Sequence, residues 1–368
     1  YYSMNAVEKW TKFNAEVFPT VPTKDLIIHP REHDLIIGTF GRAIWVMDDI
    51  RPLREIAINP EVLDKKLHLF DPPNAYLTKY QQPTGSRFGA DAIYNAENRK
   101  YGSMLTYFYK VEDKKAKDSL SLKIYDDERL IRTLKAKAPS ETGLHRWYWN
   151  LTEKGVERPR RKEVKSKVEP SGVVVMPGKY KVVLGTASET SEVYVVVRTD
   201  PRLDLSEQAI EDRYKYSKTI EGYLGQVTLA VNQLKSSKRT LATYKKRIGK
   251  KDEEINKILV ERIEAATEKI DSIMDLFIGK EDKRQGIVRN PENSVMKRIY
   301  TASRYIRSRP YGITDTEKAL VKHTSDDLRI ALKQTNAFFE ENWEDLKSAI
   351  EAVKLSEFEE IKRFEIVE

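Results

Sequence analysis

The 368-residue sequence contains no cysteine. Disulfide bonds, metal-thiolate sites and thiol nucleophiles are therefore excluded. A chain of this length does not need disulfides to fold, so the absence fits both the cytosol and the periplasm. Stability must come from hydrophobic cores, and the length allows two or three domains.

Long apolar runs are also missing. No stretch approaches the roughly 20 residues that a membrane helix requires. The opening residues, YYSMNAVEKW, lack both an initiator methionine and the basic-then-apolar pattern of a secretory signal. We therefore predict no transmembrane segment, and we expect the chain to be an internal or processed piece of a longer protein.

Signatures of catalysis are scarce. The sequence has no nucleophile-elbow serine, P-loop or glycine-rich dinucleotide fingerprint. Asp48 and Asp49 are adjacent on an expected strand, so their side chains point to opposite faces and cannot flank one glycosidic bond. His29 and His33 have helical spacing, but Pro30 and the β context argue against a shared metal. We predict turn roles for these residues, and no catalytic, metal or cofactor site.

Positive charge is in excess but dispersed. The 65 Lys and Arg residues exceed the 57 Asp and Glu residues, which gives a net charge of +8. The two signs are interleaved along the chain, which does not indicate a nucleic-acid-binding surface. One dense basic cluster, ERPRRKEVKSK, spans 157–167. Two interpretations stay open: a mobile solvated loop, or a polyanion-binding patch formed by Arg158, Arg160, Arg161 and Lys162.

Residues 1–56 alternate apolar and polar positions with a period of two. The runs KDLIIHP, DLIIGTF and RAIWVMD predict three short strands, at 25–28, 35–39 and 43–47. Gly41 lies where a hairpin turn needs a residue that tolerates positive φ. Residues 57–80 form a connector, in which Pro72 and Pro73 exclude a central strand.

Residues 81–203 carry several further β-type runs separated by Gly, Pro, Asp and Asn. Regularly spaced short strands of this kind predict an Ig- or fibronectin-like β-sandwich. Trp147 and Trp149 fall on one face of the run HRWYWNL, because alternate residues of a strand share a face. This face is either the sandwich core or an aromatic platform for a carbohydrate or peptide ligand.

Residues 204–368 change to a helical period. Four amphipathic segments are expected, each with one apolar stripe and a charged remainder. The third is expected from Pro291 to Arg307. Segments of this kind, joined by linkers rich in glycine and charge, predict an antiparallel helical bundle.

The opening strands resemble the last blade of large bacterial sortilin-like or BNR-repeat β-propeller proteins. The shared pattern comprises Asp34-Leu35, Gly38-Thr39, Gly41-Arg42, Ile44-Trp45, Asp48-Asp49-Ile50 and Pro52-Leu53. Two positions depart from it, since Phe40 and Ala43 stand where that family usually has a small residue and a glycine. The resemblance implies a propeller remnant at 1–56, then an Ig-like sandwich and a helical bundle.

A hairpin of this size cannot form a propeller alone, because each blade packs between two neighbours. We therefore expect some of Ile27, Leu35, Ile37, Ile44 and Val46 to be exposed in this chain. The expected partners are missing upstream blades or another protein chain.

The resemblance implies a non-catalytic binding or assembly role in an exported protein of the periplasm, outer membrane or cell surface. Asp118-Ser119-Leu120 and Asp271-Ser272-Ile273 also resemble the O-glycosylation motif of exported Bacteroidetes proteins. An alternative is the accessory end of a xyloglucanase-like propeller glycoside hydrolase, with its catalytic acids upstream. A third hypothesis is a scaffold whose helical bundle docks a separate partner.

Overall fold

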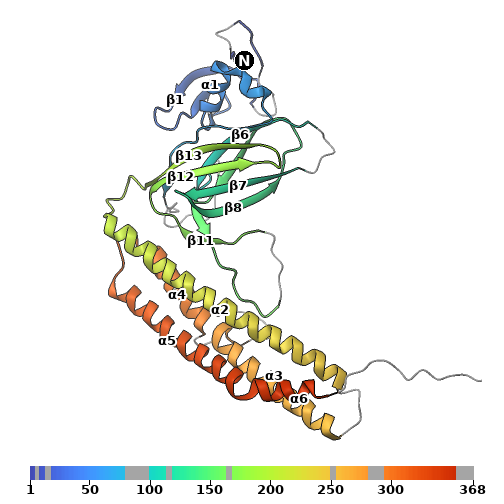
Figure 1. Ribbon diagram of the computed structural model, residues 1–368. Helices are drawn as coiled ribbons and strands as arrows, with labels where there is room; N and C mark the ends of the chain where they lie inside the picture. Colours follow the sequence, from blue (N-terminus) through green and yellow to red (C-terminus); the bar gives the residue numbers. More distant parts are fainter. Residues whose placement is uncertain are drawn as a thin grey trace, which may run out of the picture. The chain divides into compact units, whose positions relative to one another are not determined.

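The computed structural model describes residues 1–4, 8–12, 18–78, 99–112, 118–162, 168–248, 254–280 and 294–353. The chain combines several β-sheets with a C-terminal helical region (Figure 1). It divides into two units: Tyr1–Gly155 with Ser166–Ser206, and Val156–Lys165 with Glu207–Glu368. The first unit holds the strands, and the second holds the long helices.

Three antiparallel strands open the β-rich unit, in the order β1-β2-β3. They are β1 Thr23–Ile28, β2 Leu35–Thr39 and β3 Ile44–Met47. The three predicted strands are therefore confirmed to within two residues at each end. Gly41 has a φ of 84° in the second turn, as expected, and Ala43 also lies in the left-handed region, with a φ of 55°. A side chain there carries a steric cost that glycine would avoid.

The predicted connector contains more structure than the sequence indicated. It forms the 3₁₀ turn η1 Pro60–Asp64 and the short strands β4 Leu67–Leu69 and β5 Ala75–Leu77, and the helix α1 Arg51–Ile58 precedes it at the end of the predicted blade segment. β4 and β5 lie at the outer edges of two different sheets. The two prolines fall between them, which agrees with the exclusion of a central strand.

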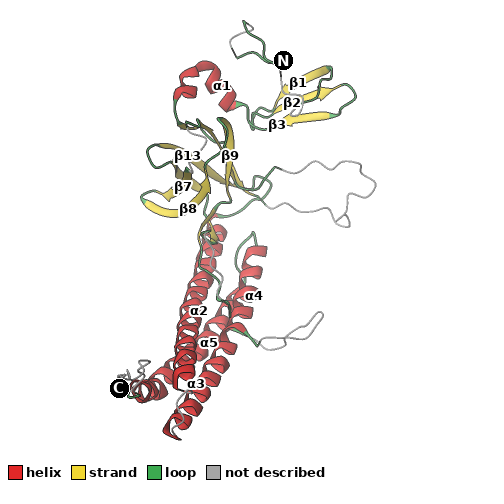
Figure 2. Cartoon of the chain, turned by 90° about the vertical axis from the view of Figure 1, so that its right-hand side faces the viewer, coloured by secondary structure: helices red, strands yellow, loops and turns green. Residues whose placement is uncertain are grey.

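The remaining strands are β6 Ser103–Tyr109, β7 Ser119–Asp126, β8 Arg129–Lys137, β9 Gly143–Trp149, β10 Thr152–Lys154, β11 Ser171–Val174, β12 Gly178–Gly185 and β13 Thr190–Thr199. They form a five-stranded sheet in the order β5-β13-β12-β7-β8, a three-stranded sheet in the order β4-β6-β9, and a β10-β11 pair. Apolar side chains from the two larger sheets share one hydrophobic core. Both sheets therefore line this core, and the pair is called the sandwich below. Figure 2 shows the helical and β-rich parts of the chain by secondary structure.

The helical unit contains α2 Glu207–Ile248, α3 Glu254–Ile278, α4 Val295–Ser308, α5 Asp315–Phe338, the π-helical segment η2 Phe339–Trp343 and α6 Glu344–Glu351. One apolar core joins all of these helices. Lys238 pairs with Asp271 at 2.6 Å, and Lys245 pairs with Glu264 at 2.5 Å. Residue numbers rise along α2 as they fall along α3, so these two helices are antiparallel.

The bundle has three rows rather than four separate antiparallel helices. α3 and α4 follow one another along the length of α2, and α5, η2 and α6 succeed one another directly in the chain (Figure 1). Arg298 of α4 pairs with Asp327 of α5 at 2.9 Å, and Arg309 pairs with Glu317 at 3.2 Å, which fixes α4 and α5 as antiparallel. None of the helices in the described part of the chain carries a stretch both long and apolar enough to cross a bilayer.

Candidate interaction surface and its polar support

One face of the β1-β2-β3 sheet is apolar and open. Ile27 lies opposite Ile36, Ile36 lies opposite Val46, and Ile44 lies two residues before Val46 on β3. Cross-strand partners and alternate residues share a face, so these four aliphatic side chains form one patch, called here the open face. Ile27, Ile44 and Val46 are 55%, 69% and 57% exposed. The described part of the chain therefore leaves most of this patch in contact with solvent.

The opposite face of the same sheet is partly covered. Leu26, Ile37 and Trp45 are cross-strand neighbours on it. Ile37 is buried, and the Trp45 ring meets the Phe18 ring edge-on, with 5.5 Å between centroids. Leu26 remains exposed. Of the five aliphatic residues expected at the surface, three are exposed, while Ile37 is buried and Leu35 is half-buried on this covered face.

Because the open face is exposed, its aliphatic side chains do not contribute the free energy that their burial would give. Full burial of one large aliphatic side chain contributes about 1.5–3 kcal/mol. Single exposed apolar residues are common on protein surfaces, but a contiguous patch marks an interaction site. The open face combines β-branched residues from all three strands, which gives it the character of an inner sheet surface.

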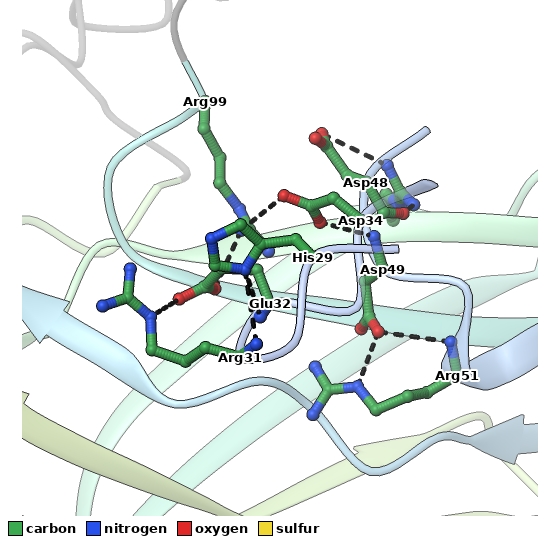
Figure 3. A network of polar contacts seen from close by, with 9 residues as sticks. His29, Arg31, Glu32, Asp34, Asp48, Asp49, Arg51 and Arg99 are labelled. Atoms are coloured by element: carbon green, nitrogen blue, oxygen red, sulfur yellow. Dashed lines mark hydrogen bonds and ion pairs between the residues drawn. The ribbon is translucent and has the colours of Figure 1, made fainter. Parts of the chain in front are cut away.

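A polar network lies at the base of this sheet and is shown in Figure 3. The turn between β1 and β2 supplies Glu32 and Asp34, whose carboxylates lie 3.0 and 3.6 Å from the guanidinium of Arg99. Glu32 also pairs with Arg31 at 2.7 Å, and this hydrogen-bonded carboxylate raises the pKa of Arg31. Arg99 precedes β6, so the network ties the first sheet to the neighbouring sandwich.

Asp48 and Asp49 belong to the same network. They follow the end of β3, and both are engaged by backbone or arginine groups. The Asp49 N–H donates to Asp34 Oδ1 at 2.9 Å, and its Oδ1 accepts from Arg51 Nε at 2.6 Å. Arg146 of β9 donates to the Asp48 carbonyl and lies 3.7 Å from its carboxylate. Both aspartates lie in the segment between β3 and α1, where Asp49 Oδ1 also accepts the Arg51 N–H at 3.3 Å, and the N-cap of α1 is Ile50.

His29 and His33 lie in the turn between β1 and β2. His29 Nδ1 accepts two backbone N–H groups within the turn, and His33 Nδ1 lies 3.4 Å from Arg54 Nη1. In the described part of the chain, no three His, Asp or Glu side chains are placed to hold a metal ion. The sequence did not indicate Arg99 or Arg146, because their partners lie 67 and 98 residues away.

The sequence allowed two roles for Trp147 and Trp149, as part of the core or as a platform for a ligand. Trp149 is fully buried, its Nε1 donates to the Thr152 carbonyl at 3.0 Å, and its ring packs edge-on against Tyr180. Trp147 is partly buried and packs against the same core. A ring with no exposed area cannot stack on a sugar, so Trp149 belongs to the core and the two rings do not form an open platform.

The basic cluster divides into inward and outward side chains. Pro159 is buried and Arg161 is half-buried, whereas Arg158, Arg160 and Lys162 are exposed. This alternation is typical of an extended chain lying on a surface. The proposed four-residue patch is therefore reduced to three side chains, and residues 163–167 of the cluster lie outside the described residues.

Arg161 shows where this segment is anchored. Its guanidinium donates to Asp275 and, at 2.6 Å, to the carbonyl of Gly279 at the C-terminus of α3. Thr228 of α2 donates to the Glu157 carbonyl at 2.7 Å. Residues 157–161 are thus packed against the helices, and the prediction of a free solvated loop is wrong for this part. A basic side chain at the C-terminus of a helix also interacts favourably with the negative end of the helix dipole.

Comparisons with known proteins assign no family. Neither a protein family nor a curated protein matches the sequence. A solved structure titled "pT26-6p" aligns at 9% identity with a TM-score of 0.10, over 68% of this chain and 46% of that one. This chain therefore covers less than half of that structure's length, and a likeness at this level carries no argument.

Proposed function

We propose that this chain is a binding and assembly region from the C-terminal end of an exported cell-envelope β-propeller protein. The observation that carries the proposal is the open face of the β1-β2-β3 sheet. Three of its four aliphatic residues are more than half exposed although they sit on a regular, paired sheet. In this proposal the sheet is part of a terminal blade, and upstream blades of the same protein cover it.

The turn geometry supports the blade interpretation. The pattern shared with sortilin-like propellers has a glycine before the arginine. Here that glycine is Gly41, which has positive φ in the β2–β3 turn. The aspartates after β3 close the polar network that joins the sheet to the sandwich. Ala43 is the exception, since it keeps a left-handed backbone where the family usually has glycine.

Two features support an Ig-like identity for the sandwich. First, its strands fall into the sets β4-β6-β9 and β5-β13-β12-β7-β8, which corresponds to an Ig order with the first strand divided between the sheets. Second, Tyr180 lies near the start of β12, and its hydroxyl donates to the Met176 carbonyl at 2.7 Å. A tyrosine bonded to the backbone a few residues upstream is a feature of Ig sandwiches.

The proposal includes a location and a partner. The resemblance implies a location outside the cytoplasm, in the periplasm or at the cell surface. The partner is an apolar sheet surface, because the open face offers aliphatic side chains and few charges. A carbohydrate platform at Trp147 and Trp149 is not part of the proposal, since Trp149 is buried.

Co-expression with the polypeptide encoded upstream tests the proposal. We expect a stable complex by size-exclusion chromatography with light scattering. A double variant, Ile27→Asp with Ile44→Asp, places two charges on the open face. It should weaken association at least about tenfold, because a charge buried against an apolar sheet costs well over 1.4 kcal/mol.

Ile258→Asp is the matched control, because Ile258 is 56% exposed on α3 and belongs to the helical unit. This variant should bind like the parent. Near-ultraviolet circular dichroism would confirm that the sandwich is intact in both variants. Absence of a complex with the parent, or equal binding by the double variant, would contradict the proposal. Cleavage of a polysaccharide by this chain alone would contradict its non-catalytic character.

A further inference from the structure

The turn between β1 and β2 is organised around one side chain. The His29 N–H donates to the Asp34 carbonyl at 2.9 Å, and the His29 carbonyl accepts from the His33 N–H at 2.9 Å. In addition, His29 Nδ1 accepts the backbone N–H groups of Arg31 at 3.3 Å and of Glu32 at 3.1 Å. One residue therefore satisfies four hydrogen bonds in a six-residue turn (Figure 3).

These contacts require one protonation state of the ring. A backbone N–H can only donate, so His29 Nδ1 must offer its lone pair and cannot carry a proton. The ring is then neutral, with its proton on Nε2. A protonated imidazole has two donors and no acceptor, and it would leave the N–H groups of Arg31 and Glu32 without this partner.

The shape of this turn matters beyond the turn itself. It positions Glu32 and Asp34 against Arg99, and Asp34 Oδ1 also accepts the Asp49 N–H. The His33 carbonyl accepts the Ile50 N–H at 3.0 Å. The turn thus connects the first sheet to the segment after β3 and to the segment before β6.

The surroundings of His29 carry charges of both signs. Within the turn these are Arg31, Glu32, His33 and Asp34. From the other segments they are Asp48 and Asp49 after β3, Arg51 and Arg54 of α1, Arg99 before β6 and Arg146 of β9. The set contains five arginines and four carboxylates.

We propose that His29 is a pH-dependent cap of the β1–β2 turn. At neutral pH its Nδ1 holds the turn closed. On acidification a proton takes the place of the two backbone donors, the turn opens, and Glu32 and Asp34 lose their fixed position against Arg99. The cap is present while the ring is neutral and is lost when the ring gains a proton, so the expected direction is loss of the cap on acidification. This inference does not depend on what covers the open face.

Two substitutions of His29 distinguish the effect of the hydrogen-bond acceptor at the Nδ1 position from the effect of protonation. Asn carries its Oδ1 on Cγ, as His carries Nδ1, and Asn readily accepts a backbone N–H two residues on. His29→Asn should therefore keep the turn closed without titrating. His29→Gln places its amide one bond further out, near the position of Nε2, and should leave the turn uncapped at every pH.

The test is a nuclear magnetic resonance titration of the full chain from about pH 8 to 5, with ¹⁵N in Arg, Glu and His. In the parent, the amide signals of Arg31 and Glu32 should move in one transition together with the His29 ring nitrogens. In His29→Asn both amides should stay at the closed position across the range. In His29→Gln both should stay at the open position.

Two results would overturn the proposal. One is a His29 ring that titrates while the amides of Arg31 and Glu32 stay fixed. The other is a His29→Asn variant whose amides still move with pH, which would assign the change to Glu32, His33 or Asp34. The amide signals of the sandwich strand β12 serve as an internal control, and they should not move in any of the three proteins.

Discussion

The first sheet and the sandwich both contain strands with an apolar face, but only in the sandwich is that face buried. In the sandwich, Val182 and Val195 are fully buried between two sheets. In the first sheet, Ile27, Ile44 and Val46 are paired just as regularly and remain more than half exposed. The difference lies in whether a second layer is present to cover the strand face. An alternating apolar pattern therefore identifies a strand that needs a partner, and does not show that the same chain supplies it.

The two regions also differ in what holds them. The sandwich has a continuous core to which both of its large sheets contribute. The first sheet is attached to its neighbour through charged groups, notably Arg99 and Arg146 with the carboxylates and carbonyls of two turns. Ion pairs near the surface contribute little each, and salt screens them. We therefore expect the first sheet to be the less stable part of the β-rich unit.

Replacement of a tryptophan in each region should give the largest contrast. Trp149→Ala should lower the free energy of unfolding by about 3–5 kcal/mol, because it removes a fully buried ring from the core. Trp45→Ala should cost about 1 kcal/mol, since that ring is 36% exposed and packs against one phenylalanine. Urea unfolding followed by near-ultraviolet circular dichroism would measure both. Equal losses of stability in the two variants would contradict the view that the sandwich is better packed than the first sheet.

A valine pair tests the same contrast without a large change of volume. Val182→Thr buries a hydroxyl in the sandwich core and should cost about 1–3 kcal/mol. Val46→Thr places the same hydroxyl on the open face, where water can solvate it, and should change stability by less than about 0.5 kcal/mol. Thermal unfolding of both variants provides the comparison. A loss at Val46 as large as that at Val182 would mean that the open face is already covered in solution.

The hydroxyl of Tyr180 should have a smaller effect. Tyr180→Phe keeps the ring against Trp149 and removes the hydroxyl that donates to the Met176 carbonyl. We expect a loss of about 0.5–1.5 kcal/mol, the usual net value of one hydrogen bond. The amide signals of β1, β2 and β3 should not change. A spectrum in which the first sheet also rearranges would show that the two regions are coupled through the core.

The smallest expected effect is a change in stability at low pH, caused by protonation of Asp200. The hydrogen bond from Arg202 holds the pKa of the buried Asp200 below its usual value, so this group stabilises the fold when ionised. That contribution is present above the pKa of unfolded aspartate, about 3.9, and is lost as the pH falls through the lower folded value. Because Arg202 is largely exposed, we expect less than about 1 kcal/mol. Asp200→Asn should destabilise the protein at neutral pH, and the difference should narrow near pH 3. A difference that persists in acid would assign the loss to packing.

Elements with a clear local period could be predicted from the sequence. The strands β1–β3 and the long helices follow from the spacing of apolar residues alone. α4 was expected from Pro291 but begins at Val295, after Ser294 accepts the Lys297 N–H as the N-cap. Three-residue strands such as β4 and β5 are too short to show a period, and their place depends on partners far along the chain, as in the parallel pairing of β5 with β13.

The polar contacts could be predicted only in part. Local context predicted turn roles for His29, Asp48 and Asp49. His29 accepts two backbone N–H groups in the β1–β2 turn, whereas Asp48 and Asp49 lie in the segment between β3 and α1. The anchoring of Arg161 on Asp275 could not be foreseen, because it joins residues 114 positions apart. From composition alone, every basic residue of the cluster has the same expected exposure. In the structure, Arg161 packs against the helices, whereas Arg160 is exposed.

Hydrogen exchange of the first sheet tests the central claim most directly. Amides of β1 and β3 would be compared in this chain and in the protein that includes the polypeptide encoded upstream, with β12 amides as the internal reference. We predict at least about tenfold slower exchange of β1 and β3 in the longer protein, because burial of the open face would stabilise the sheet by more than 1.4 kcal/mol. The β12 amides should exchange at the same rate in both. Slow and equal exchange of β1 and β3 in both proteins, with this chain monomeric, would contradict the account.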